Sequence, residues 1–205
     1  MRMIIAPAKQ MKVDTDTFPC PDLPVFLDRS ELLKDHLNSL SFKEQKKLWA
    51  CNNKIAAENH ERFAHMDLRH NLTPALLAYD GIQYTYMAPS VFENAYFGYV
   101  QEHLRILSGF YGVLKPMDSV VPYRLEMQAK TSPIGCKNLY EFWGDLLYRE
   151  VLPDDRSVAQ RCSGASCALD AEGWISTLSY RSGGVNREVA YQYSNPVKLL
   201  SDFLM

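Results

Sequence analysis

Charged residues alternate with apolar ones along PYRLEMQ (122–128). This alternation predicts a strand with one apolar face and one charged face. Arg124 and Glu126 are two residues apart, so their side chains point the same way, about 6.5 Å apart along the strand. An arginine there can bind phosphate or carboxylate, and the nearby carboxylate can orient it or act as a base. The alternative is a buried salt bridge that fixes the sheet to its helices.

Other candidate polar residues lie next to apolar runs. The run at 1–6 ends at Pro7 and predicts a buried strand, and Lys9 follows in the loop. A lysine in the loop after a strand is well placed to reach an anionic ligand. The alternative is a solvated loop lysine. Further along, Glu141 and Asp145 lie beside an aromatic cluster in LYEFWGD.

Lysines gather on a pair of predicted helices between residues 41 and 63. Ser41 with Glu44 has the spacing of a capping box and predicts a helix start. On that helix the lysines at 43, 46 and 47 share one face, because residues three and four apart are neighbours. A break at Cys-Asn-Asn (51–53) precedes a second helical stretch that begins at Lys54. The alternative is two surface helices with solvated lysines.

Histidine and cysteine spacing does not predict a metal or thiol site. His60, His65 and His70 recur every five residues, which does not bring them onto one helix face. The five cysteines form no zinc-like pairs and fit a reducing compartment, so we expect a cytoplasmic protein. Cys136 lies beside Lys137, but the sequence shows no resolving partner for a sensor thiol. No cofactor is predicted.

Both strands and helices are expected to carry these residues. Strands are expected near residues 1–6, 76–86 and 120–128. Val100, Leu104 and Leu107 recur at helical spacing, which predicts a helix that ends at Gly109. A further helix is predicted to start at an Asp28 cap. The fold class is therefore α+β, with a mixed sheet surrounded by helices.

Composition and net charge limit the number of domains and the kinds of partner that the chain can have. The chain has 205 residues, 47% hydrophobic and 22% charged, as expected for one globular domain or one domain with an appendage. No apolar run approaches the roughly 20 residues of a membrane span, so no membrane partner is expected. With a net charge of −2, a nucleic-acid partner would have to bind a local basic patch. No protein partner is inferred.

Several blocks of sequence, in order, carry a family resemblance. They are IAPAK ending at Lys9, AYDGIQY (78–84), LRILSGFYGVLKPMD (104–118), PYRLEM (122–127) and NLYEFWGD (138–145). Together they resemble the signature blocks of the YaaA family, the bacterial peroxide-stress proteins, over about residues 1–148. Because several long blocks recur in the right order, the match is far more specific than one short motif.

The resemblance implies a DNA-binding protein of the hydroperoxide response. The family is described as carrying a helix-hairpin-helix element, which we place at residues 41–63. Duplex DNA is then expected along Lys43, Lys46, Lys47 and Lys54, through phosphate contacts that are largely independent of sequence. A typical hairpin of this motif has glycines that approach the phosphates, whereas this chain has Cys-Asn-Asn.

The matching blocks also suggest a second class of function. They would line one cleft with charges of both signs, from Lys9, Arg105, Arg124, Glu126, Glu141 and Asp145. Such a cleft could serve an enzyme that acts on an anionic small molecule. No nucleophile–base pair or phosphate loop identifies a reaction.

The C-terminal segment 149–205 does not resemble the family. We expect an atypical and loosely packed continuation of the domain formed by residues 1–148. Divergence, truncation or a frame shift would each explain it, so an inactive truncated homologue is a third possibility.

Overall fold

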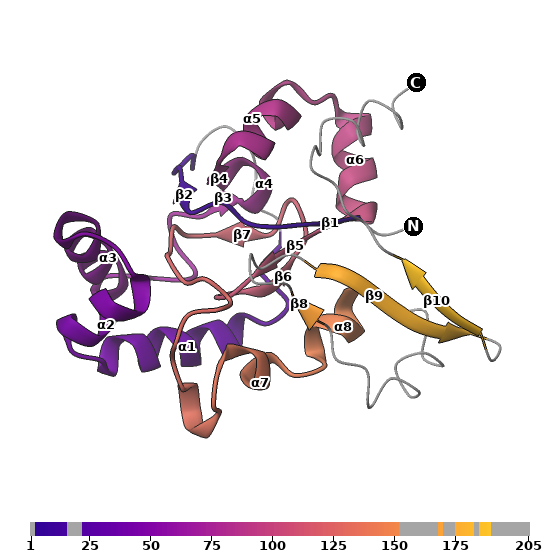
Figure 1. The fold of residues 1–205 in the computed structure, drawn as a ribbon. Helices are drawn as coiled ribbons and strands as arrows, with labels where there is room; N and C mark the ends of the chain where they lie inside the picture. The colour runs from indigo at the N-terminus through magenta and orange to yellow at the C-terminus, as the bar shows by residue number, and fades with distance from the viewer. Residues whose placement is uncertain (1–2, 16–21, 152–167, 170–174, 183–184, 190–205) are drawn as a thin grey trace. The chain divides into compact units, whose positions relative to one another are not determined.

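The computed structural model describes residues 3–15, 22–151, 168–169, 175–182 and 185–189, with side chains for the first two ranges. The chain divides into two compact units, Met1–Gly144 and Asp145–Met205 (Figure 1). We describe each unit by itself.

A three-stranded sheet crosses the first unit. Its middle strand β5 (Leu104–Ser108) runs parallel to β1 (Met3–Ile5) and antiparallel to β6 (Gly112–Leu114). Parallel neighbours need a crossover connection, and here most of the helices of the unit lie in the chain between β1 and β5. Ile106 and Leu114 pair across β5 and β6 and are fully buried, so the core lies against this sheet.

Two short antiparallel pairs fasten loops of the first unit. β2 (Gln10–Met11) pairs with β4 (Tyr79–Asp80), and β3 (Thr73–Pro74) pairs with β7 (Ser119–Val120). The first pair holds the loop after β1 against the AYDGIQY block. The second holds the chain just before PYRLEM.

Helices surround these strands, which confirms the α+β class. Figure 1 shows α1–α3 grouped on one side of the β1–β5–β6 sheet and α4–α6 on the other. The helices of the first unit are α1 (Leu27–Ser39), α2 (Phe42–Trp49), α3 (Asn53–Ala64), α4 (Ala75–Ala78), α5 (Ile82–Met87), η1 (Pro89–Val91), α6 (Asn94–His103), η2 (Pro133–Gly135) and α7 (Leu139–Trp143). No helix in the described part of the chain is both long and apolar enough to cross a bilayer.

Where the structure describes it, the second unit contains one helix and a small sheet. α8 (Leu146–Val151) is followed by β8 (Ala168–Leu169), β9 (Ile175–Ser182) and β10 (Val185–Val189), in the antiparallel order β10-β9-β8. Most of the segment predicted to be loosely packed, 149–205, lies outside the described residues. Loose packing there stays a prediction.

The predicted helix up to Gly109 is wrong at its C-terminal half. α6 ends at His103, and Leu104 and Leu107 lie on β5. Strand pairing of Met3 with Leu104 sets this boundary, and such a long-range contact is invisible in local spacing. Gly109 does not end a helix. A Cβ at this position would lie 2.7 Å from the carbonyl oxygen of Leu125, so Gly109 allows close approach of two backbones.

The predicted strand at 76–86 is also largely wrong. Only Tyr79–Asp80 is a strand, and the flanking residues form α4 and α5. Tyr84 is buried while Ile82 and Tyr86 are exposed, so the apolar residues of α5 do not mark one buried strand face. Short apolar runs fit a helix or a strand, and length does not separate the two here.

The run 120–128 keeps its predicted alternation but forms little strand. Tyr123 and Leu125 are buried and Arg124 and Glu126 are half-buried, although only Ser119–Val120 joins a sheet. The predicted Asp28 cap is wrong, since Phe26 is the N-cap of α1 and no side chain caps it.

Candidate functional site

The predicted pair of helices at 41–63 is present as α2 and α3. The capping box is confirmed: the Ser41 hydroxyl accepts from the Glu44 N–H, and a Glu44 carboxylate oxygen accepts from the Ser41 N–H at 2.9 Å. The Ser41 hydroxyl also donates to this carboxylate at 2.6 Å, and this bond, together with the one from the Ser41 N–H, lowers the pKa of Glu44. The Glu44 carboxylate is thus bound by Ser41 at the start of α2.

The turn between the helices differs from the expected one. The left-handed residue is Ala50 (φ 46°, ψ 47°), just before the predicted Cys-Asn-Asn break. Asn52 instead caps α3, because its side-chain oxygen accepts from the Ile55 N–H at 2.9 Å. The N-terminus of α3, beside Lys54, therefore faces the turn, and such a helix end favours anions.

Buried polar and aromatic contacts fix the helix pair to the core. Gln45 is fully buried; its amide donates to the Leu37 carbonyl at 2.7 Å, and its oxygen lies 2.7 Å from His60 Nδ1. Trp49 stacks on Phe63 with ring centroids 5.8 Å apart. The lysine-bearing helices are thus held rigidly, and sequence patterns gave no sign of the Gln45 bridge.

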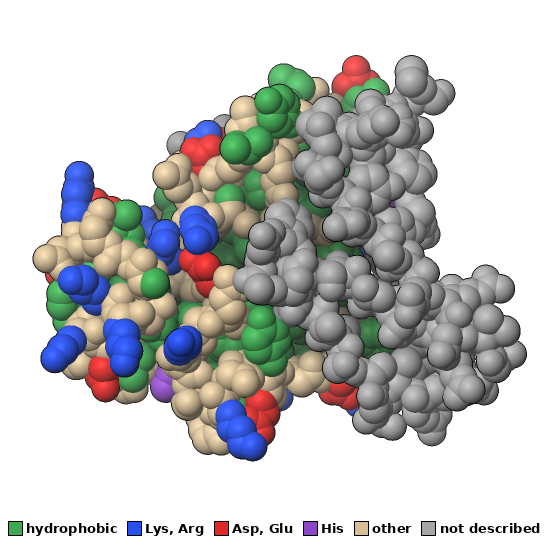
Figure 2. Space-filling model, viewed as in Figure 1, with side chains coloured by type: hydrophobic (Ala, Val, Ile, Leu, Met, Phe, Trp, Pro, Cys, Tyr) green, Lys and Arg blue, Asp and Glu red, His purple; other side chains and the backbone are tan. Residues whose placement is uncertain are grey.

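The four predicted DNA-contacting lysines lie on α2 and at the start of α3. Lys43, Lys47 and Lys54 are exposed, and Lys46 is half-buried. Among the described residues, none of the four lies within ion-pair distance of a carboxylate. Figure 2 shows Lys and Arg side chains spread over the region of α2 and α3. The pair therefore presents a cationic surface that internal carboxylates do not neutralise.

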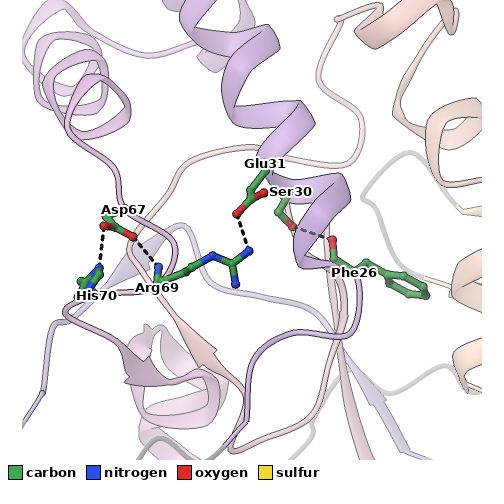
Figure 3. A network of polar contacts seen from close by, with 6 residues as sticks. All are labelled: Phe26, Ser30, Glu31, Asp67, Arg69 and His70. Carbon is green, nitrogen blue, oxygen red and sulfur yellow. Dashed lines mark hydrogen bonds and ion pairs between the residues drawn. The ribbon is translucent and has the colours of Figure 1, made fainter.

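A separate polar network ties the chain after α3 back to α1 (Figure 3). Arg69 Nη2 lies 2.9 Å from a carboxylate oxygen of Glu31. Asp67 accepts from the Arg69 N–H at 2.8 Å and lies 2.7 Å from His70 Nδ1, and these bonds lower the pKa of Asp67. Ser30 donates to the Phe26 carbonyl at 3.3 Å in the first turns of α1.

The three histidines have separate partners. His60 lies beside Gln45, His65 beside Glu61 and His70 beside Asp67. Within the described residues, no group of three or more His, Cys, Asp or Glu side chains is arranged to hold a metal ion.

Three of the six predicted cleft residues come together. Lys9 Nζ lies 3.0 Å from Glu126 Oε1, and Arg124 Nη2 lies 3.9 Å from the same oxygen. Arg124 and Glu126 thus point the same way, as their spacing predicts. We call Lys9, Arg124 and Glu126 the cation cluster.

The family-like blocks are neighbours in space around this cluster. A Cβ at Gly109 would meet the backbone of Leu125–Met127 within 2.9 Å, and the Trp143 indole N–H donates to the Gly109 carbonyl at 3.0 Å. A Cβ at Gly81 would lie 2.9 Å from the Ala8 Cβ. Gly109 is needed because the backbone of Leu125–Met127 packs against it, and Gly81 because the Ala8 side chain, next to Lys9, lies against it.

Buried hydroxyl groups lie beneath PYRLEM. Ser108 Oγ accepts from the N–H groups of Phe110 and Tyr111 and lies 2.6 Å from the Tyr123 hydroxyl. Because both lone pairs of Ser108 are used, its own proton must go to Tyr123. Tyr123 lies 2.9 Å from the Tyr79 hydroxyl, and burial raises the pKa of Tyr123 to about 12. Both phenols are neutral at physiological pH, and their hydroxyl groups serve the packing of the core.

The other three predicted residues lie in different settings. Buried Arg105 donates to the carbonyls of Gln101 and Leu104 at the junction of α6 and β5. Glu141 is exposed and accepts from the Lys137 N–H at 2.6 Å. Asp145 belongs to the second unit, where it pairs with Arg149.

Asp118 is a buried carboxyl group that sequence reasoning missed. Burial raises its pKa to about 7, and nearby Asp22 adds to this. The Lys115 N–H, which donates to Asp118 at 2.8 Å, and the charge of Arg105 act in the opposite direction. The burial of Asp118 depends on tertiary packing, which the local sequence does not reveal.

Comparison with known proteins places these observations in a family. A sequence model described as peroxide stress protein YaaA matches residues 1–165, which extends past the expected boundary at 148. A UPF0246 protein of Desulfitobacterium hafniense is 53% identical over 186 residues, covering 91% of this chain and 71% of the relative. UPF0246 proteins of Agathobacter rectalis and Pediococcus pentosaceus are 55% and 49% identical over 163 residues, covering 80% of this chain and 66% and 65% of the relatives. The chain thus spans about two thirds of the length of most of these relatives.

Proposed function

Because the chain belongs to the YaaA family of peroxide stress proteins, we propose that it is a cytoplasmic DNA-binding protein of the hydroperoxide response. Duplex DNA lies along the lysine face, which we define as Lys43, Lys46, Lys47 and Lys54. The helix-hairpin-helix-like pair α2–α3 presents this face to the phosphates.

One observation carries this proposal. The four lysines have no carboxylate partner among the described residues, and Glu44, the acid nearest in sequence to the three lysines of α2, is bound to Ser41. An exposed cluster of unneutralised lysines attracts a polyanion, since neutralising phosphates releases their counterions. The anchoring of α2 and α3 through Gln45 and Phe63 holds these charges in a fixed arrangement.

The turn supports phosphate contact in a modified form. The left-handed residue at Ala50 reverses the chain, and the Asn52 cap leaves other N–H groups at the start of α3 directed outward. A non-glycine turn keeps the backbone farther from a phosphate than a glycine turn does. Lysine side chains therefore supply most of the affinity, and binding is largely independent of sequence.

Paired substitutions test this assignment. Lys43→Gln/Lys47→Gln removes two exposed charges from the lysine face, and Lys130→Gln/Lys137→Gln removes two exposed charges elsewhere. Fluorescence anisotropy with a labelled duplex, at several salt concentrations, gives the slope of log affinity against log salt. We expect the first variant to flatten this slope by about 2 and the second to leave it near the wild-type value. Equal effects of the two variants would contradict the proposal.

A further inference from the structure

We propose that Lys9 and Arg124 bind one oxyanion group of a small molecule, a carboxylate or a phosphate, at a site separate from the lysine face. Glu126 holds the two cations in place when the site is empty and is displaced from Lys9 when the ligand binds. This site goes beyond DNA binding and does not depend on it.

Charge balance is the first argument. Lys9 and Arg124 both approach the same oxygen of Glu126, so two cations share one carboxylate. A second ion pair, between Lys12 just after β2 and Asp80 on β4, gives a comparison: Lys12 Nζ lies 3.3 Å from Asp80 Oδ1. The Lys12 and Asp80 side chains are 65% and 35% exposed, against 65% and 34% for Lys9 and Glu126. The two pairs differ in the additional arginine, which leaves the cation cluster with one uncompensated positive charge.

The burial of Arg124 is the second argument. Its side chain is only 17% exposed, and its Nε is buried without a hydrogen-bond partner among the described residues. The 3.9 Å contact to Glu126 is too long for a hydrogen bond. A desolvated guanidinium with unfilled donors is costly, and its planar fork matches two oxygens of a carboxylate or phosphate. An incoming oxyanion would provide the acceptors that Glu126 does not provide.

The scaffold under the cluster is rigid enough for a site. The backbone of Leu125–Met127 packs directly against Gly109, and Ala8 packs against Gly81. The loop after β1 is further held by the pairing of Met11 with Tyr79. The segments that carry Lys9 and Arg124 are therefore each fixed by close packing, and in the proposal the Glu126 side chain moves to admit a ligand.

A thermal-shift titration tests the site directly. Acetate, inorganic phosphate and chloride are each added at matched ionic strength, so that general screening is equal in all three. We expect acetate or phosphate to raise the melting temperature by about 3–6 °C at about tenfold excess over its Kd. Whichever of the two acts identifies the ligand as a carboxylate or a phosphate. Identical responses to all three anions would overturn the proposal.

Variants of the cluster supply the controls. Arg124→Gln and Lys9→Gln should abolish or weaken the anion-specific shift, whereas Lys12→Gln should retain it. Equal loss in Lys9→Gln and Lys12→Gln would overturn the assignment. Because Arg124→Gln could also disturb folding, Glu126→Gln provides a gain of function. It removes the competing carboxylate and should tighten anion binding by about five- to tenfold, and unchanged or weaker binding would overturn the proposal.

Duplex binding separates this inference from the proposed function. Arg124→Gln should keep the duplex affinity of the wild type, and the fourfold variant with Gln at 43, 46, 47 and 54 should keep the anion-specific shift. A loss of duplex affinity in Arg124→Gln as large as that of the lysine-face variants would show that the cation cluster contacts DNA. That result would overturn a separate small-molecule site and would leave the DNA proposal standing.

Discussion

The lysine face and the cation cluster use the same residue chemistry in opposite ways. On the lysine face, the cations lie on a helix pair, mostly exposed and without internal carboxylate partners among the described residues. In the cation cluster, Lys9 and a largely buried arginine share Glu126. Exposed and dispersed charge suits a long polyanion, whereas partly buried and converging charge suits one compact group.

This difference predicts opposite responses to salt and to local packing. Affinity at the lysine face should fall steeply with salt, because each contact releases counterions. Affinity at the cation cluster should depend more on the position of the backbone under Arg124, since a bidentate contact needs fixed geometry. A substitution in one of the two regions should therefore leave binding at the other unchanged.

The largest effect is expected for Gly109→Ala. The added Cβ would meet the Leu125 carbonyl oxygen at 2.7 Å and the Met127 nitrogen at 2.8 Å, and both are backbone atoms. Unfolding in urea should show a loss of about 2–4 kcal/mol. Anion binding at the cluster should fall with it, while duplex affinity at a temperature where the variant is folded stays unchanged.

Gly98 in α6 provides the matched glycine control. A Cβ at this position has no heavy atom within 4 Å, so Gly98→Ala should raise the free energy of unfolding by about 0.5–1 kcal/mol. If Gly109→Ala were as stable as the wild type, the close packing of these two backbones would be refuted.

An intermediate effect is expected for Asp118→Asn, and it depends on pH. The folded-state pKa of about 7 lies above the ordinary value of 3.8, so the folded protein binds this proton more strongly than the unfolded chain. The resulting stability is fully present below pH 3.8 and is lost as pH rises through 7. Between about pH 4 and pH 8, the wild type should lose about 1–3 kcal/mol relative to Asp118→Asn, measured by urea unfolding.

Asp118→Asn also tests whether Arg105 contributes to anion binding at the cation cluster. Arg105 donates to the carbonyls of Gln101 and Leu104, and its charge acts on Asp118. Asp118→Asn should therefore change neither anion binding nor duplex affinity. A changed anion affinity would add Arg105 to the cation cluster.

The smallest effect is expected for Ser41→Ala, which removes the cap of α2. Loss of a serine N-cap costs about 1 kcal/mol in the free energy of unfolding. Ser39→Ala is the control, because exposed Ser39 donates only to the His36 carbonyl and should stay within about 0.5 kcal/mol of the wild type. Anion binding should be the same in both variants. A Ser41→Ala variant with full stability would show that the capping box is not needed.

Local sequence patterns predicted the features that depend on neighbours in the chain. Ser41 and Glu44 form their capping box, and Arg124 and Glu126 share one side of their segment. These outcomes follow from short-range geometry. The mixture of predicted strands and helices led to the α+β class, and the resemblance predicted the family because its blocks are long and ordered.

Features set by long-range contacts could not be predicted in this way. Pairing with β1 turns Leu104–Ser108 into a strand in place of a helix. The burial of Asp118 beside Arg105, and the Gln45 bridge to Leu37, join residues from different elements. The spacing of these residues does not distinguish them from surface positions. Their burial and their contacts therefore could not be predicted from the sequence alone.

The most direct test of the central claim is the salt dependence of duplex binding by the purified chain and by its variant with Gln at 43, 46, 47 and 54. For the wild type we expect a slope of log affinity against log salt of about −3 to −4, equivalent to about a hundredfold loss between 50 and 200 mM salt. The variant should bind weakly with a slope near zero. A wild-type affinity that does not respond to salt, or a variant that binds as the wild type does, would contradict phosphate binding at the lysine face.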